Sequence, residues 1–203
     1  MLERIRNVLV TGLGIVLCLF TLAEANYHVL QPQSALAVFG MLGLVLCYLI
    51  YPVHPRLKDH KVHRRVDLLL ALATVVCCGY VIVQTEPLFQ RLWPGGQSIG
   101  NRAGAETHAD FAIGLAGVLL VLEATRRSIG AIVPLLSLAF VLHSFYCHLS
   151  SHYGLVGMPD WMLPHDGQHL KDIASTTFLQ SLGVFGPAAR VMFNYVFLFV
   201  VFG

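Results

Sequence analysis

An acidic residue and two arginines end an otherwise apolar stretch in the middle of the chain. Glu123 follows twelve residues without charge, Phe111–Leu122, and Arg126 and Arg127 lie three and four positions further on. Residues at these spacings share one side of a helix. An ionised side chain inside a membrane-spanning helix costs about 2.5–3.5 kcal/mol at the centre and less near an end, so it requires a partner. The spacing therefore predicts an ion pair between Glu123 and one of the arginines.

Two interpretations of Glu123, Arg126 and Arg127 are open. In the first, the ion pair is structural: it fixes the register of its helix, and the arginines extend to the lipid headgroups on the cytoplasmic side. In the second, the three residues form a charge site that contacts a substrate or another subunit. A glutamate within a membrane needs a cation in either case. We therefore treat the three residues as a structural ion-pair motif.

Histidines offer a second candidate chemistry, because the chain contains ten of them. His143, His148 and His152 flank Cys147, and His143 is deep enough in its apolar segment to bind a haem iron. A membrane cytochrome needs a second histidine at similar depth across the bundle, and the first four apolar segments contain none in their interiors. We therefore expect packing and hydrogen bonding from these residues, with no metal site and no cofactor. The same expectation holds for three histidines in a basic loop, where positive charge opposes a cation: His54, His60 and His63.

The chain contains none of the common motifs of soluble enzymes. It has no phosphate-binding loop, no GxSxG, no HExxH and no pair of carboxylates at a catalytic spacing. The net charge is only +2 and is spread over several loops, which does not suggest nucleic-acid binding. We therefore expect no enzymatic activity, no catalytic residue and no nucleic-acid partner, and the sequence assigns no substrate-binding residue.

Composition indicates the elements that position these residues. Of the 203 residues, 56% are hydrophobic and 12% charged, whereas soluble domains carry about 25% charged residues. A span of about 20 apolar residues crosses a bilayer. The sequence therefore predicts an all-α, polytopic membrane bundle with five or six spans. The expected spans are Val8–Ala23, Ala35–Tyr51, Leu68–Val83, Phe111–Thr125, Ile132–Cys147 and a last run that starts near Val191.

Basic residues predict the orientation of these spans, because cytoplasmic loops are enriched in Lys and Arg. If the N-terminus is cytoplasmic, nine Lys and Arg residues lie inside and four lie outside. The segment Val53–Val66 alone carries five of the nine. We therefore expect a multi-pass protein of the bacterial inner membrane with a cytoplasmic N-terminus. The four outside residues are Arg91, Arg102, Lys171 and Arg190.

Polar residues, glycine and proline predict one further helix and two helix starts. Helical spacing of apolar residues over Leu170–Phe185 predicts an amphipathic helix on the bilayer surface or against a partner, and Gly186 and Pro187 end it. Asp67 and Asp110 are expected at helix N-termini, where the dipole favours acids. One further polar residue, Asn194, follows this Gly- and Pro-containing stretch, and interrupted helices of that kind line sites in transporters.

Three stretches together form a recognisable pattern: Leu120–Arg127 with Gly130 and Pro134, Ser181–Pro187 with Tyr195–Gly203, and Tyr51-Pro52 with the basic loop and Asp67. The pattern resembles the fused permease subunits of TRAP transporters, the tripartite ATP-independent periplasmic transporters, in their TAXI branch. The resemblance extends over essentially the whole chain. Arg190 departs from the small and apolar residues that the family tends to have there.

The resemblance implies a fold and a function. Residues 1–130 would form a four-span scaffold domain, and residues 131–203 the fifth span, a connecting helix and the start of a large permease domain. A periplasmic binding protein would deliver an organic anion, and an ion gradient, usually of sodium, would drive uptake without ATP. The substrate and sodium sites would lie in the large domain, outside this chain. Glu123, Arg126 and Arg127 are the only residues that the resemblance marks here.

The sequence leaves two other classes of function open. One is a membrane redox subunit that binds haem through His143 and His148. The other is a structural assembly subunit without transport activity. Because the chain stops at Gly203, inside the expected start of the large domain, we expect either a fragment or one half of a split permease.

Overall fold

The protein is mostly helical. The structure is a computed structural model that describes residues 2–52, 61–154, 159–163 and 165–202, and these contain no β-strand. Five of its helices are long and apolar enough to cross a membrane, which confirms the predicted all-α bundle of a multi-pass membrane protein. They are α1 (Leu2–Tyr27), α2 (Pro32–Ile50), α3 (Lys61–Thr85), α4 (His108–Ser128) and α5 (Ile132–Tyr153).

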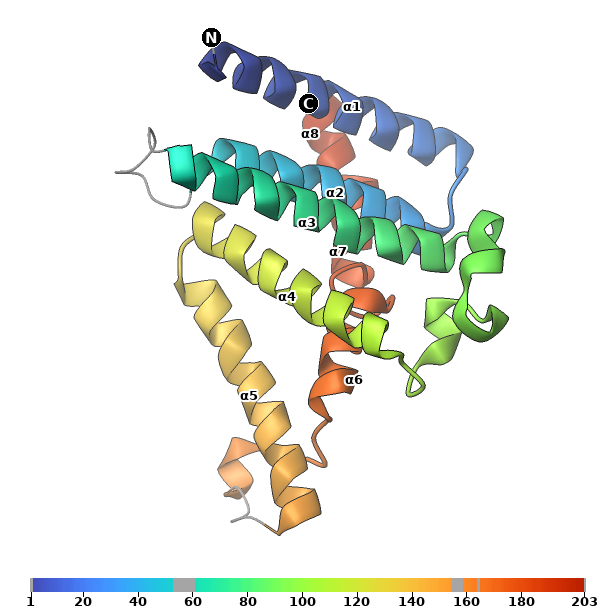
Figure 1. Ribbon diagram of the computed structural model, residues 1–203, viewed down its shortest axis with the longest axis vertical. Helices are drawn as coiled ribbons and strands as arrows, with labels where there is room; N and C mark the ends of the chain where they lie inside the picture. The colour runs from blue at the N-terminus through green and yellow to red at the C-terminus, as the bar shows by residue number, and fades with distance from the viewer. Residues whose placement is uncertain (1, 53–60, 155–158, 164, 203) are drawn as a thin grey trace.

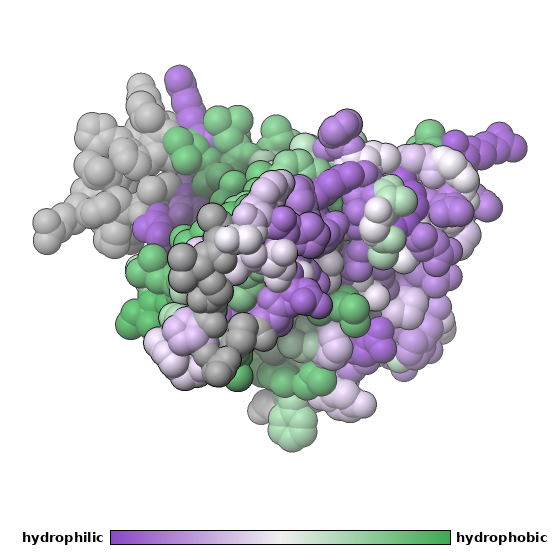
Figure 2. All heavy atoms as spheres, turned by 90° about the horizontal axis from the view of Figure 1, so that it is seen from below, coloured by the Kyte–Doolittle hydropathy of each residue, from purple (hydrophilic) through white to green (hydrophobic). Residues whose placement is uncertain are grey.

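The first four helices run in alternating directions and pack side by side, with α2 between α1 and α3 and with α4 against α2 and α3 (Figure 1). Helix α5 diverges from α4, and the C-terminal part of the chain crosses the other helices at a steep angle. In a view from below, hydrophilic residues gather toward the end of the molecule that holds the segment between α3 and α4 (Figure 2). The bundle therefore has a polar end next to apolar helix surfaces.

Local sequence signals set several helix ends. Pro32 occupies the first turn of α2, where its missing N–H is not needed, and α2 stops just before Pro52. The Thr107 side chain caps α4 by accepting a hydrogen bond from the Asp110 N–H, and the Asp110 side chain bonds back to the Thr107 N–H. This reciprocal capping box satisfies two backbone donors at the start of α4. The expected place of Asp110 at a helix N-terminus is thereby confirmed.

The segment between α3 and α4 is long and has no α-helix or strand, as its Pro and Gly residues predict. It forms three 3₁₀ turns, η2 (Pro87–Leu92), η3 (Pro94–Gly96) and η4 (Ile99–Arg102). The Trp93 indole Nε1 donates a hydrogen bond to the Val83 carbonyl at 2.8 Å, which holds this segment against α3.

The predicted amphipathic helix over Leu170–Phe185 is wrong in its length and in its setting. Helix α6 (Leu170–Ala174) continues as a wider helical turn, η6 (Ser175–Leu179), and Gln180 is extended, so the helix ends there. The Val184 N–H donates to the Thr177 carbonyl at 2.7 Å. This bond folds the chain back on itself. The close approach requires glycine at position 183, because a Cβ on Gly183 would lie 2.0 Å from the Thr177 carbonyl oxygen.

The apolar side of this segment is covered by the protein's own helices instead of facing the bilayer. Phe178 and Leu179 are buried, and so is Phe185 beyond the turn. After the turn the chain continues as α7 (Pro187–Val191), η7 (Met192–Phe197) and α8 (Leu198–Phe202). This last apolar helix is shorter than the five spans and lies across them, so it does not join the bundle as a parallel sixth span.

The core lies between α2, α3, α4 and the C-terminal segment. Many of its members are small, which lets helix backbones approach closely where no water drives association. Four larger side chains from the C-terminal segment fill the space beside them: Phe178, Leu179, Phe185 and Phe193. The buried small residues include Ala37, Ala71, Cys77, Cys78 and Ala124.

Candidate functional site

The predicted ion-pair motif at the end of α4 is formed. Glu123 accepts hydrogen bonds from both arginines, at 2.7 and 2.8 Å from Arg126 and at 2.8 Å from Arg127. The two arginines differ strongly in environment, since the Arg126 side chain is 42% exposed and the Arg127 side chain only 1%. Arg127 is therefore the buried member of the motif.

Arg127 also joins three helices, which the sequence did not predict. Its Nη1 donates to the Asp67 carboxylate of α3 at 2.6 Å and to the Tyr51 carbonyl at the end of α2 at 3.2 Å. Its guanidinium lies 5.0 Å from the centre of the Tyr48 ring, a cation–π contact. The prediction that Asp67 stands at a helix N-terminus is wrong, because α3 begins at Lys61 and Asp67 lies in its second turn.

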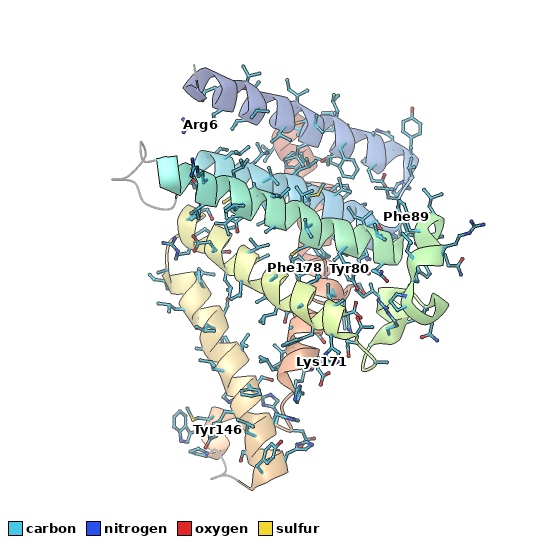
Figure 3. All side chains as sticks on the ribbon, in the orientation of Figure 1. Arg6, Tyr80, Phe89, Tyr146, Lys171 and Phe178 are labelled. Carbon is cyan, nitrogen blue, oxygen red and sulfur yellow. The ribbon has the colours of Figure 1, made fainter. Side chains whose placement is uncertain are left out.

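A second buried ion pair lies at the opposite end of the bundle. Asp110 is fully buried, and its carboxylate accepts hydrogen bonds from Tyr80 at 2.7 Å and from Arg102 at 3.2 Å. Arg102, which the sequence placed in an outside segment, is only 5% exposed and also donates to Gln84 at 3.0 Å. Figure 3 shows Tyr80 on α3 close to α4. This group joins the 3₁₀ segment to α3 and α4.

Both buried arginines keep hydrogen-bond donors that no described residue satisfies: Nε and Nη1 of Arg102, and Nη2 of Arg127. Buried polar groups are almost always paired, with protein or with ordered water. Each end of the bundle therefore holds a buried arginine whose hydrogen bonds are only partly supplied by the described residues.

The turn between η6 and α7 reaches the middle of the bundle. The Phe178 ring lies against Gly117 in the middle of α4, where a Cβ would be 2.3 Å from the ring. The Phe185 ring lies against Gly40 in the middle of α2, at 3.1 Å from such a Cβ. The two rings meet edge to face with their centres 5.2 Å apart. Figure 3 labels Phe178, close to α4.

The histidines of α5 separate into two groups. His143 lies beside Cys147 and stacks on His165, whereas His148 packs against His152 and His169. His143 and His148 lie five positions apart on one helix and contact different neighbours. The structure thus does not bring together the two histidines that the haem hypothesis pairs.

Two further polar residues of the apolar segments, Glu24 near the end of α1 and the candidate Asn194, have simpler settings. Glu24 accepts from the N–H groups of Val29 and Leu30 and so ends the turn after α1, and Asn194 is exposed on η7. His54 and His60 lie outside the described residues. His165 had no signal in the sequence, because it gains its neighbours only when the chain folds back beside α5.

The chain was compared with family models, with curated proteins and with solved structures. No family model, curated protein or solved structure matches it.

Proposed function

We propose that this chain is the membrane-embedded scaffold of a TRAP-type secondary transporter that takes up an organic anion, such as a carboxylate, delivered by a binding protein outside the cell. An ion gradient, most simply of sodium, drives uptake. The chain assembles with a larger permease domain, fused or separate, that holds the substrate and ion sites. The division into a scaffold over residues 1–130 and a connecting part over residues 131–203 belongs to the same proposal.

The observation that carries the proposal is the interrupted helix at the middle of the bundle. Secondary transporters place non-helical backbone between half-helices near the bilayer midplane. Irregular backbone occurs at that depth only where protein surrounds it or where it lines a water-filled cavity. Here the turn after η6 is surrounded by α2 and α4, at Gly40 and Gly117. The Gln33 amide also donates to the Leu179 carbonyl at 2.5 Å, which satisfies backbone where η6 ends.

The buried ion pairs support a scaffold role. Arg127 joins α2, α3 and α4 at one end, and Arg102 with Asp110 joins α3 and α4 at the other. Such pairs fix the register of helices in a bundle more than they add stability. A bundle held at both ends is suited to remain still while a second domain moves against it.

Uptake in the host cell tests the proposal. The gene is deleted and restored, and uptake of radiolabelled succinate, glutamate, pyruvate and 2-oxoglutarate is measured. Uptake of at least one carboxylate should be lost on deletion and return with the gene. It should also fail with monensin, which collapses the sodium gradient, and persist with arsenate, which depletes ATP.

Two results would contradict the proposal. Uptake of all four carboxylates that is unchanged by deletion would favour an assembly subunit without transport. A purified sample with a haem Soret band would favour the redox subunit.

A further inference from the structure

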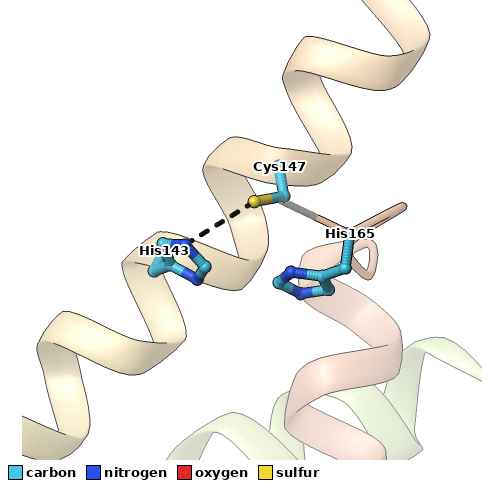
Figure 4. A group of neighbouring side chains, drawn as sticks. All are labelled: His143, Cys147 and His165. Carbon is cyan, nitrogen blue, oxygen red and sulfur yellow. Dashed lines mark hydrogen bonds between the residues drawn. The ribbon is translucent and has the colours of Figure 1, made fainter. Parts of the chain in front are cut away.

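The end of α5 brings together three side chains of types that bind transition metals. His143 and Cys147 lie four positions apart on α5, so they face the same way, and His165 reaches them from the segment ahead of α6 (Figure 4). One candidate ligand atom from each residue lies within 4.8 Å of the other two. The three residues therefore converge on one point from two separate parts of the chain.

The distances are close to those of a tetrahedral zinc site. The Cys147 sulfur lies 3.9 Å from His143 Nε2, and the rings of His143 and His165 stack with their centres 5.3 Å apart. Zinc bonds of about 2.0–2.1 Å to nitrogen and about 2.3 Å to sulfur place neighbouring ligand atoms about 3.4–3.6 Å apart. A contraction of about 1 Å, within reach of side-chain rotation, brings the three atoms onto one ion.

We propose that His143, Cys147 and His165 form a binding site for a zinc ion. Two imidazoles and a thiolate suit zinc, whereas sodium, magnesium and calcium prefer oxygen ligands. Three protein ligands leave a fourth position for water or another small ligand. This site is independent of the transport proposal, since it uses none of the residues that hold the bundle.

The surroundings of His165 suit metal ligation. A ligating imidazole needs an acceptor for the ring nitrogen that the metal does not take. His165 has one on either side, the Leu163 carbonyl 3.3 Å from Nδ1 and the Ser144 hydroxyl 3.5 Å from Nε2. His143 Nε2 lies 2.8 Å from the Met162 carbonyl, a hydrogen bond that ligation through this atom replaces.

Burial divides the site into a protected side and an open side. Cys147 is only 3% exposed, whereas His165 is exposed. An ion can therefore enter past His165 and be held on the buried sulfur. Once bound, it adds to the contacts that already join α5 to the chain between η5 (Asp160–Met162) and α6, which include the His143–Met162 hydrogen bond and the stack of His143 on His165.

Metal substitution tests the site in the purified full chain, isolated with a tag that contains no histidine. Co²⁺ titrated into the wild type should reach about one equivalent and give a thiolate-to-cobalt charge-transfer band that Zn²⁺ removes. Cys147→Ser should abolish the band, and His143→Gln and His165→Gln should each weaken zinc binding at least about 10-fold. His152→Gln and Cys47→Ser, one on the same helix and one in α2, should bind as the wild type does.

A second measurement uses the wild type alone and therefore does not depend on the folding of a variant. Zinc added to the wild type should slow alkylation of Cys147 by a maleimide, read by mass spectrometry of its peptide, and leave alkylation of Cys18 unchanged. A wild type without a charge-transfer band would overturn the proposal. So would a band that persists in Cys147→Ser, zinc binding that is unchanged in His165→Gln, or Cys147 alkylation that zinc does not slow.

Discussion

At the scale of single residues, Arg127 is the side chain that connects α2, α3 and α4 at one end of the bundle. It is almost completely buried, and two carboxylates from two helices pair with it, Glu123 and Asp67. Removing one partner of a buried ion pair leaves an uncompensated charge, which costs far more than the pair itself contributes. Among the described residues, the neighbouring Arg126 forms an ion pair with Glu123 alone, and 42% of its side chain is exposed.

The two arginines therefore predict opposite outcomes for the same substitution. Arg127→Ala should lower the free energy of unfolding by about 3–5 kcal/mol, because Asp67 loses its cation and Glu123 loses one of two. Arg126→Ala should change it by less than about 1 kcal/mol, as for exposed pairs. Thermal unfolding in detergent compares them. Equal losses in the two variants would contradict the assignment of Arg127 as the buried anchor.

Local pairs could be predicted from the sequence, and distant ones could not. The Glu123 pairs follow from spacings of three and four on a helix, and the capping role of Asp110 follows from its place at a helix start. The contact between Arg127 and Asp67 joins residues 60 positions apart. No partner for Arg102 could be predicted from the sequence, because only the folded 3₁₀ segment brings it to Asp110.

At the scale of elements, the contact between α4 and η6 decides where the chain turns. The Phe178 ring occupies the space that a side chain at Gly117 would need. Apolar spacing predicted a longer helix over this region, because periodicity reports which residues are buried but not where a backbone hydrogen bond folds the chain back. The helix is interrupted at the wider turn of η6 and at the glycines that follow it, and apolar periodicity contains no information about either feature.

The glycine contact leads to a prediction with a matched control. Gly117→Ala should destabilise the protein by about 1–3 kcal/mol, because overpacking displaces the Phe178 ring. Gly79→Ala in α3 should have little effect, since nothing lies within 4 Å of a Cβ there. Adding Phe178→Leu to Gly117→Ala should restore part of the loss. A destabilisation equal in the Gly79 and Gly117 variants, measured by thermal unfolding in detergent, would contradict the contact.

At the scale of the whole molecule, successive crossings of the bilayer make the directions of α1–α4 predictable, whereas the path of the C-terminal segment was not predictable. Helices that each span the membrane must alternate in direction whatever the length of the link between them, and the apolar runs of the sequence indicate how many there are. The path of Pro187–Phe202 across the bundle depends on contacts with α1 and α2, such as those of Phe193 with Phe20 and Phe39. No local sequence pattern predicts these contacts.

The predicted orientation of the bundle is tested by cysteine labelling. Leu88 and Ile129 are 85% and 73% exposed and follow α3 and α4, which end on opposite sides. In a chain whose native cysteines are replaced, Leu88→Cys should react with a membrane-impermeant maleimide in intact spheroplasts. Ile129→Cys should react only after permeabilisation, because basic residues place that end inside. The reverse pattern would contradict a cytoplasmic N-terminus.

The central claim is that the turn docked at the middle of the bundle serves transport. The most direct measurement is sodium-driven carboxylate uptake by deletion cells that carry Gly117→Leu or Gly79→Leu at equal abundance in the membrane. We predict that Gly117→Leu loses uptake, because η6 and the turn can no longer dock on α4, and that Gly79→Leu keeps the wild-type rate. Wild-type uptake by Gly117→Leu at matched abundance would contradict the claim.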